Sequence, residues 1–121
     1  MYKHLKTSNI ILYCKNWETT VSFYRDTLCL PVNFSNDWFF EFILSPSARL
    51  SVADENRAKM KSCKGKGIII TLEVDDIELA YEYAMNAGIK PTKVKNHPWG
   101  ARLFYLEDPE GHHIEIWQPS E

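Results

Sequence analysis

The spacing of apolar residues predicts two short helices, each preceded by an apolar strand. Ser8–Cys14 is apolar enough to form a buried strand, and a second run rich in β-branched residues covers Ile68–Val74. After each run, apolar residues recur three and four positions apart, which is the spacing of one helix face, over Asn16–Leu28 and over Asp76–Ala87. Each helix is therefore expected to pack one apolar side against a sheet.

Residues at the helix ends support both predictions. Asn16 stands where its side-chain oxygen can accept a hydrogen bond from a free backbone N–H. Asp75 is expected to cap the second helix, with Glu78 three residues later as the other half of a capping box. Pro31 is expected to follow the end of the first helix, and Gly88 to end the second.

The two halves of the chain repeat the same pattern at an interval of 60 positions, which separates Pro31 from Pro91 and Asn16 from Asp76. Three β-like segments separated by turn residues follow each helix. In the first half these segments are Val32–Phe34, Trp38–Leu44 and Arg49–Ala53. In the second half they are Thr92–Lys95, Ala101–Leu106 and His113–Gln118.

We therefore predict an α+β fold in which two βαβββ modules with mixed, curved sheets stand in tandem. Residues 1–121 would form one domain of two repeats, about 5–56 and 67–119, joined by a basic linker at 57–66. One helix covers only one face of a sheet, so the other face must be covered by a second module. Pairing two such faces would enclose a cavity.

The composition favours a cavity that binds a small molecule. Aromatic residues make up 13% of the chain, more than a small core is expected to absorb, so some rings should line the cavity.

A net charge of −2 gives no sign of a nucleic-acid surface, and no apolar run approaches the roughly 18 residues that span a membrane. Three distant cysteines, Cys14, Cys29 and Cys63, suit neither a disulfide framework nor a zinc knuckle, and a secretory signal is missing. We expect a cytoplasmic protein.

Two motifs identify a family resemblance. The first is VSFYRDTL at 21–28, and the second is Trp99-Gly100 followed by a strand and DPEGHHIEI at 108–116. They resemble the FYxxxL and WG…DPxGxxIE motifs of the vicinal oxygen chelate superfamily, which contains glyoxalases, bleomycin-resistance proteins and extradiol dioxygenases. The resemblance covers the whole chain and implies the fold of that group. Cys29 departs from the glycine usual in the family at that position.

The resemblance also indicates where a metal would be held. Metalloenzymes of the family bind a divalent ion through the first and last strands of each half, which correspond here to Asn9, Ser51, Ile69 and Glu115. Of these, only Glu115 is a good ligand, because catalytic metals need three or more nitrogen, carboxylate or thiolate donors. We therefore expect no metal cofactor; a divalent metal would require the positional assignment to be wrong.

Strand alternation places further residues beside Glu115. His113, Glu115 and Trp117 should share one side of the last strand, while adjacent His112 and His113 cannot chelate one ion from a regular strand. Tyr105, ten residues before Glu115, is expected on the same face. Glu115 itself is either a carboxylate satisfied by an arginine or backbone N–H, or a ligand-facing general base.

Three further features are expected near the cavity, and two of them leave alternatives open. Trp99 is expected at the mouth of the cavity. Arg102 forms either a salt bridge at the rim or an anchor for a ligand carboxylate or phosphate. Alternate rings of Trp38–Phe42 must face inward, but the sequence does not indicate which. The predicted ligand-binding residues are Asn9, Ser51, Ile69, Trp99, Arg102, Tyr105, His113 and Trp117, with Glu115 as the candidate catalytic residue.

Three functions are compatible with these features. The first is a metal-free protein that binds a planar or aromatic molecule, as in the bleomycin-resistance branch. The second is a metal-free enzyme with Glu115 as base and Tyr105 or His113 as its partner. The third is a metal-dependent lyase, isomerase or dioxygenase. The resemblance further implies a homodimer with two equivalent pockets, in which the halves pair within or between chains.

Overall fold

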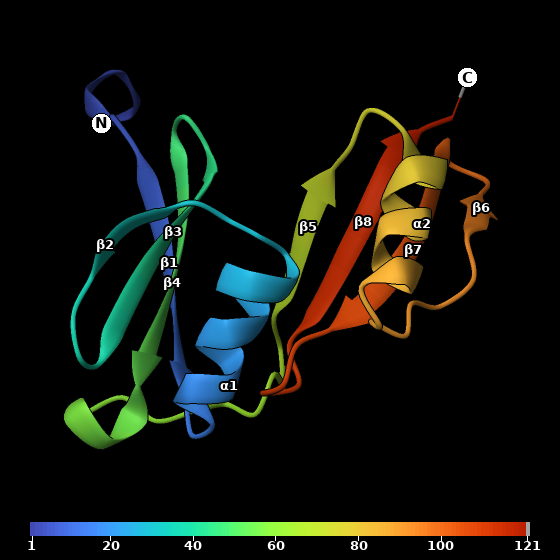
Figure 1. The fold of residues 1–121 in the computed structure, drawn as a ribbon. Coiled ribbons are helices and arrows are strands. Elements are labelled where there is room, and N and C mark those ends of the chain that lie inside the picture. The colour runs from blue at the N-terminus through green and yellow to red at the C-terminus, as the bar shows by residue number, and fades with distance from the viewer. Residues whose placement is uncertain (121) are drawn as a thin grey trace. The chain divides into compact units, whose positions relative to one another are not determined.

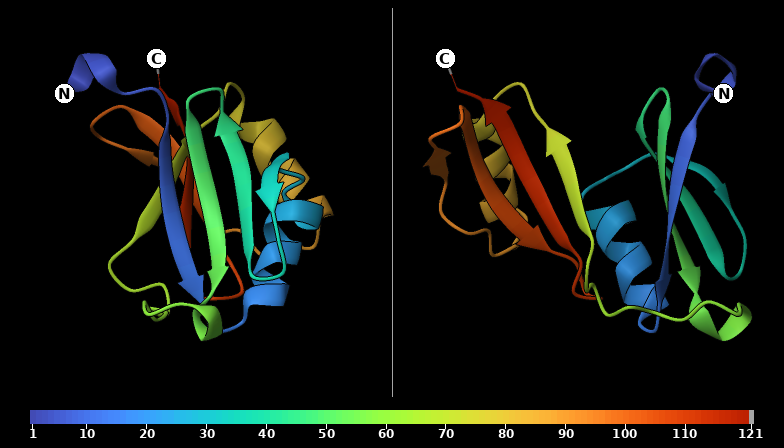
Figure 2. Two further views of the ribbon diagram at one scale, coloured as in Figure 1. Left: turned by 90° about the vertical axis from the view of Figure 1, so that its left-hand side faces the viewer. Right: turned by 180° about the vertical axis from the view of Figure 1, so that it is seen from behind.

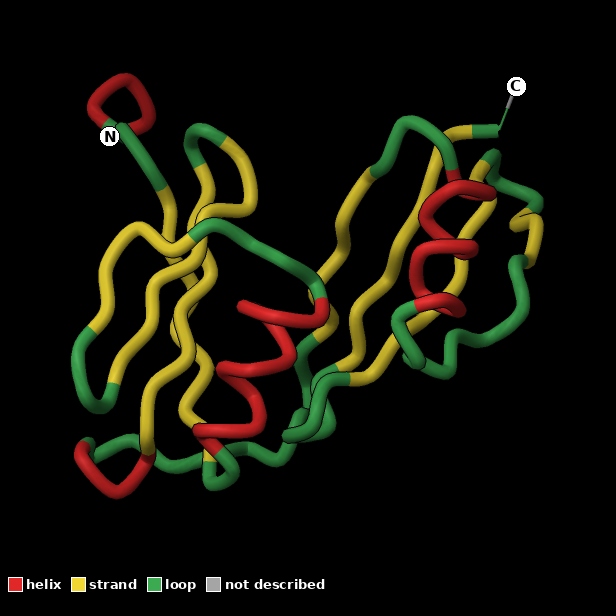
Figure 3. Tube along the Cα trace, viewed as in Figure 1, coloured by secondary structure: helices red, strands yellow, loops and turns green. Residues whose placement is uncertain are grey.

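The computed structural model describes residues 1–120, which form two compact units, Met1–Lys64 and the residues from Gly65 onward (Figure 1). The division between them falls inside the segment expected as a linker. No helix within the described residues is long and apolar enough to cross a membrane. Each unit contains one four-stranded sheet and one main helix (Figure 3).

The first unit has the strand order β1-β4-β3-β2, with β1 parallel to β4 and the other neighbours antiparallel. The strands are β1 (Ser8–Cys14), β2 (Val32–Ser35), β3 (Phe39–Ser45) and β4 (Ala48–Asp54). The helical segments are η1 (Tyr2–His4), α1 (Trp17–Ser22), the π-helical η2 (Phe23–Thr27) and η3 (Glu55–Arg57).

The second unit repeats this topology. Its strand order is β5-β8-β7-β6, with β5 parallel to β8 and the other neighbours antiparallel (Figure 2). Its elements are β5 (Ile69–Glu73), α2 (Ile77–Asn86), β6 (Lys95–His97), β7 (Ala101–Glu107) and β8 (His113–Pro119). The predicted fold class, two βαβββ modules in tandem, is thus confirmed.

Several local predictions were wrong at helix ends. Asp76, rather than Asp75, caps α2, because its carboxylate accepts a hydrogen bond from the backbone N–H of Leu79. Glu78 forms no capping box because its carboxylate is paired with Arg102. The side chain of Asn16 makes no capping hydrogen bond to α1.

Two further differences lie after the helices. The first helix is not α-helical to its end, since α1 passes into η2 at Phe23. The strand expected at Thr92–Lys95 lies later, at Lys95–His97, where it pairs with β7. Cys29 has a φ of +57°, the left-handed conformation that favours glycine.

Strand alternation in the first unit places one apolar face beneath α1. Leu12, Leu50, Val52 and Phe42 are buried on this face. The indole N–H of Trp17, at the start of α1, donates to the carbonyl of Val52 at 3.0 Å. Of the aromatic residues at 38–42, whose orientation the sequence left open, Phe40 and Phe42 face the helix. Phe40 contacts Trp17, and Phe42 contacts Tyr24 of η2. Phe39 and Glu41 precede and follow Phe40 along β3, so they project from the other face of the sheet.

The second unit is built the same way. Phe104 of β7 packs edge-on against Tyr81 of α2, with 5.3 Å between ring centroids, and Ile114 and Ile116 of β8 are buried. The Gln118 side chain accepts a hydrogen bond from the backbone N–H of Ile77 at the start of α2. These contacts fix the side of the sheet that α2 covers. The alternate residues of β7 and β8 therefore occupy the other side, called here the open face.

A buried turn sets the start of β8. The carboxylate of Asp108 accepts hydrogen bonds from the backbone N–H groups of Glu110 and His112, both at 2.9 Å, and lies 2.8 Å from Nδ1 of His112. Gly65 packs directly against this turn: a Cβ at Gly65 would lie 2.1 Å from the carbonyl oxygen of Gly111. Only a residue without a side chain fits there.

This contact predicts different outcomes for two glycines with nearly equal backbone angles. Gly65 and Gly67 have φ values of +79° and +78°, but a Cβ at Gly67 would meet nothing within 4 Å. Gly67→Ala should lower the free energy of unfolding by about 1–2 kcal/mol through backbone strain alone. Gly65→Ala should lower it by about 3–4 kcal/mol, because overpacking against the turn is added. Urea unfolding measures both, and equal losses would contradict the close packing.

Candidate functional site

The open face of the second sheet gathers five of the predicted site residues: Ile69, Tyr105, His113, Glu115 and Trp117. Cross-strand partners project from the same side of a sheet, so the register defines three rows across β7, β8 and β5. The central row contains Tyr105, Glu115 and Thr71. The flanking rows are Glu107, His113 and Ile69 on one side, and Leu103, Trp117 and Glu73 on the other. The expected side-sharing of His113, Glu115 and Trp117 is confirmed.

Tyr105 and Glu115 form the centre of this face. The Tyr105 hydroxyl donates a hydrogen bond to Oε2 of Glu115 at 3.1 Å. Burial raises the pKa of Tyr105, and the hydrogen bond to Glu115 raises it further, because both favour the protonated phenol. The carboxylate of Glu115 is therefore oriented by a hydroxyl that keeps its proton.

Arg102 does not belong to this face. Its guanidinium forms a two-point pair with the carboxylate of Glu78 on α2, so it lies on the helix-covered side of the sheet. The pairing with Glu78 raises the pKa of Arg102. Of the two alternatives for Arg102, the structure has the salt bridge, and the ligand-binding assignment placed this residue on the wrong face. Alternation from Glu115 would have shown this, since Arg102 and Tyr105 are separated by an odd number of positions.

Trp99 and the two adjacent histidines have distinct environments. Trp99 lies in the turn between β6 and β7, is 68% exposed, and has its ring centroid 5.0 Å from that of His97. His112 is buried in the turn before β8, whereas His113 is exposed on the strand, so the two point apart as expected.

Asn9 and Ser51 lie together on the first sheet, on the face that α1 leaves uncovered. The Ser51 hydroxyl donates to Oδ1 of Asn9 at 2.8 Å. Their equivalents in the second unit, Ile69 of β5 and Glu115 of β8, make no such bond because the isoleucine side chain has no polar atom. Three residues that the sequence analysis did not single out share the face with Asn9 and Ser51: Asn33, Glu41 and Arg49. Alternation from Phe40 and Phe42, which face the helix, would have revealed Glu41.

The donor chemistry at the four metal-equivalent positions does not fit a catalytic ion. Ile69 has no donor atom, Asn9 and Ser51 offer only a neutral amide oxygen and a hydroxyl that are hydrogen-bonded to each other, and Glu115 is the one carboxylate among the four. Among residues 1–120, no three His, Cys, Asp or Glu side chains lie close enough together to hold a metal.

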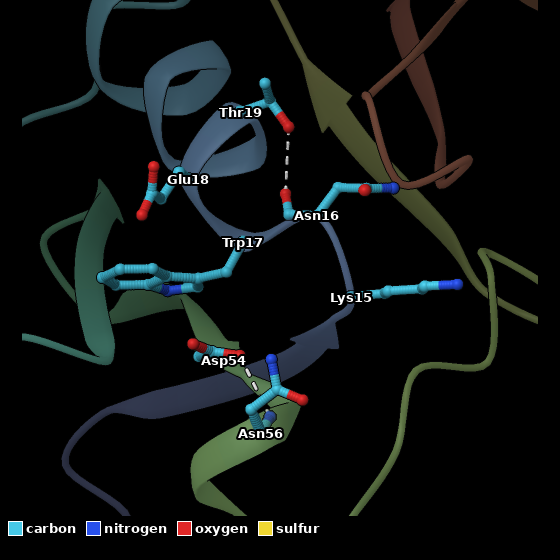
Figure 4. Close-up of a pocket in the computed structure, with 7 residues that line it drawn as sticks. All are labelled: Lys15, Asn16, Trp17, Glu18, Thr19, Asp54 and Asn56. Atoms are coloured by element: carbon cyan, nitrogen blue, oxygen red, sulfur yellow. Dashed lines mark hydrogen bonds between the residues drawn. The ribbon is translucent and has the colours of Figure 1, made fainter.

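A separate polar hollow lies at the start of α1 and has a volume of about 320 Å³ (Figure 4). None of the predicted site residues lines it. The Asn16 carbonyl accepts from the Thr19 hydroxyl there, and Asp54 accepts from the backbone N–H of Asn56. Its polar groups thus serve to end β4 and begin α1. The lining residues are Lys15, Asn16, Trp17, Glu18, Thr19, Asp54 and Asn56.

Comparison with known proteins identifies the family. A sequence model of the Glyoxalase/Bleomycin resistance protein/Dioxygenase superfamily matches residues 4–116. The chain belongs to this superfamily. YraH from Bacillus subtilis is 23% identical to this superfamily member over 129 residues, covering 94% of this chain and 98% of YraH.

Solved structures of the superfamily share the fold. TnmS3, an antibiotic binding protein from Streptomyces sp. CB03234, is 21% identical and superposes with a TM-score of 0.77, covering 94% of this chain and 95% of TnmS3. A lactoylglutathione lyase from Agrobacterium tumefaciens is 20% identical, with a TM-score of 0.75 and coverage of 91% and 90%. The resemblance seen in the two sequence motifs is confirmed.

The Tyr105–Glu115 hydrogen bond predicts a late-titrating tyrosine. Because the pKa of Tyr105 in the folded protein is raised above 10.0, its contribution to stability is present below pH 10 and is lost as the pH rises through the folded value. NMR titration of ¹³Cζ-labelled tyrosine should show one tyrosine resonance that titrates above pH 10. This resonance is assigned to Tyr105 by its loss in Tyr105→Phe. Glu115→Gln should lower the Tyr105 pKa only in part, because burial remains the larger cause. An unchanged pKa in Glu115→Gln would contradict the hydrogen bond.

Proposed function

We propose that this superfamily member is a metal-free binding protein for a planar or aromatic small molecule, which it holds against the open faces of its sheets. The observation that carries the proposal is the central row of the second sheet. There a carboxylate already hydrogen-bonded to a tyrosine lies beside Trp117 and Leu103. Such mostly apolar walls with a few converging polar groups are typical of ligand sites.

The absence of a suitable donor set supports the metal-free character. At the four metal-equivalent positions a divalent ion would find one carboxylate, Glu115, and no ligand at Ile69. Asn9 and Ser51 would add only a neutral amide oxygen and a hydroxyl, which are weak donors for zinc, nickel or iron.

Family relatives support ligand binding as the broad function. TnmS3 is described as an antibiotic binding protein, and its fold matches this chain over nearly its full length. The aromatic groups Tyr105 and Trp117 on the open face offer π surfaces to a flat ligand, and Glu115 offers a hydrogen-bond acceptor.

A second candidate function is a metal-free lyase or isomerase in which Glu115 is the general base. The hydrogen bond from Tyr105 favours it, because a positioned carboxylate beside a phenol can accept a proton from a substrate while the phenol stabilises the developing negative charge on oxygen. The Agrobacterium lactoylglutathione lyase shows that the fold also carries enzymes. A third candidate, a metal-dependent enzyme, has only Glu115 in its favour.

We propose further that the protein works as a homodimer in the cytoplasm. The edge strands β1 and β5 each carry an exposed apolar side chain on the open face of their sheet. Ile11 of β1 is 39% exposed, and Ile69 of β5 is 58% exposed. A second copy would cover this surface, and a twofold axis would cover it in both copies at once. The three cysteines form no disulfide, which suits a reducing compartment.

Ligand binding without metal is tested by calorimetry on protein dialysed against EDTA. We expect the protein to bind planar bicyclic compounds with the same affinity before and after dialysis. We also expect metal analysis before dialysis to find no stoichiometric divalent ion. Trp117→Ala should weaken binding about 10-fold because it removes a π surface, whereas Leu79→Ala on the exposed side of α2 should not. One equivalent of metal lost together with binding would favour the metal-dependent enzyme instead.

The dimer is tested by light scattering at micromolar concentration. We expect a mass twice the 14.1 kDa of the chain. Ile69→Glu should shift the protein toward the monomer, because it places a charge on an apolar surface that the second copy would cover. Leu79→Glu, an equally exposed position on α2, serves as the control. A wild-type protein that stays monomeric would refute the dimer.

A further inference from the structure

The first sheet carries an arginine on its open face that none of the family positions assigns. Arg49 of β4 lies directly across from Asn9 on β1 and Ile43 on β3. One position further along, Glu41 and Ser51 form the next row. Arg102 was the arginine expected as a possible anchor for the ligand, but its guanidinium is held by Glu78 on the helix side of the second sheet. Arg49 is the arginine on an open face.

Arg49 is fixed in place by the chain around it. Its Nη1 donates to the carbonyls of Ser45, Pro46 and Ala48 at 3.0, 3.2 and 3.3 Å, and its Nε lies 3.6 Å from Oε2 of Glu41. Oε2 of Glu41 also accepts from the Asn33 amide at 2.7 Å. The side chains of Arg49 and Glu41 are only 17% and 21% exposed, so their charges are weakly screened.

Three polar atoms of this group keep their hydrogen-bonding capacity. Within residues 1–120, nothing hydrogen-bonds to Nη2 of Arg49, Oε1 of Glu41 or Nδ2 of Asn9. The Ser51 hydroxyl occupies Oδ1 of Asn9 and thereby orients the amide so that its N–H₂ group remains available. The group thus presents two donors beside one acceptor, rimmed by the apolar side chains of Ile11 and Ile43.

We propose that Arg49, Glu41 and Asn9 bind the amide edge of the ligand, a lactam or carboxamide whose C=O accepts from Arg49 and Asn9 while its N–H donates to Glu41. This inference rests on the proposed function and specifies the chemical class of its planar ligand. The pairing of Arg49 with Glu41 makes the group neutral overall, so a ligand carboxylate would be repelled by Glu41 and a ligand ammonium by Arg49. A neutral amide satisfies both charged partners at once.

The experiment compares matched planar probes by calorimetry: 2-quinolone, N-methyl-2-quinolone, which lacks the N–H, and 2-naphthoate, which carries a carboxylate. We expect the wild-type protein to bind 2-quinolone about 10-fold more tightly than N-methyl-2-quinolone, since a hydrogen bond to a charged acceptor is lost in the latter. Glu41→Gln should reduce that ratio to about 2-fold or less, because Glu41 is the acceptor for the N–H. Arg49→Gln should instead weaken the binding of both quinolones about 10-fold, because both keep the carbonyl, while Arg102→Gln changes neither the ratio nor the affinities. Because the ratio is taken within one variant, a general loss of stability does not alter it.

The other outcomes separate this inference from the function on which it rests. Equal binding of both quinolones by the wild-type protein would overturn the amide site and leave the planar-ligand function standing. If the wild-type protein binds 2-naphthoate most tightly of the three probes, and only Arg49→Gln weakens that binding, the ligand group is a carboxylate rather than an amide. This result would also overturn the proposal. If no planar probe of any charge binds, both the amide site and the proposed function fail.

Discussion

The arrangement of this protein depends on one constraint: each four-stranded sheet has a single helix, and a helix covers one face only. Strand alternation then sorts the residues of every strand into two sets. Toward α1 and α2 lie Val52, Phe42, Phe104 and Ile114, which are almost fully buried. On the other side, apolar and aromatic groups alternate with hydrogen-bonded charged and polar groups. Neither a closed core nor an ordinary solvated surface has this composition, which is why the open faces are the candidate sites.

The two open faces are chemically different although their folds repeat. The second sheet centres on Glu115, whose one described partner is the hydroxyl of Tyr105. The first sheet centres on Glu41 and Arg49, whose charges balance. The two repeated sheets thus differ in the chemistry of their open faces: one has a carboxylate and a phenol at its centre, and the other carries both donors and acceptors of opposite charge.

The turn before β8 shows how the second module positions its acid. Asp108 bonds two backbone N–H groups and contacts His112, and Gly65 closes against the same turn from the beginning of the unit. Gly65 thus packs the segment that leads into β5 against the turn that leads into β8, at one end of the sheet. Since β5 and β8 are parallel neighbours, this contact helps to fix the register that places Glu115 between Thr71 and Tyr105.

The sequence by itself determined the repeat, the fold class and the face of β8, because these follow from local spacing: the periods of helix and strand, and two motifs that match a family. It predicted Tyr105 beside Glu115 correctly for the same reason, since a tight turn fixes which residues of adjacent strands meet. Only the tertiary structure decided the partners of long side chains. Arg102 reaches Glu78 on α2, and Arg49 joins Glu41 across two strands, because a flexible charged side chain binds whichever opposite charge the packing brings within reach, and sequence spacing does not record that distance.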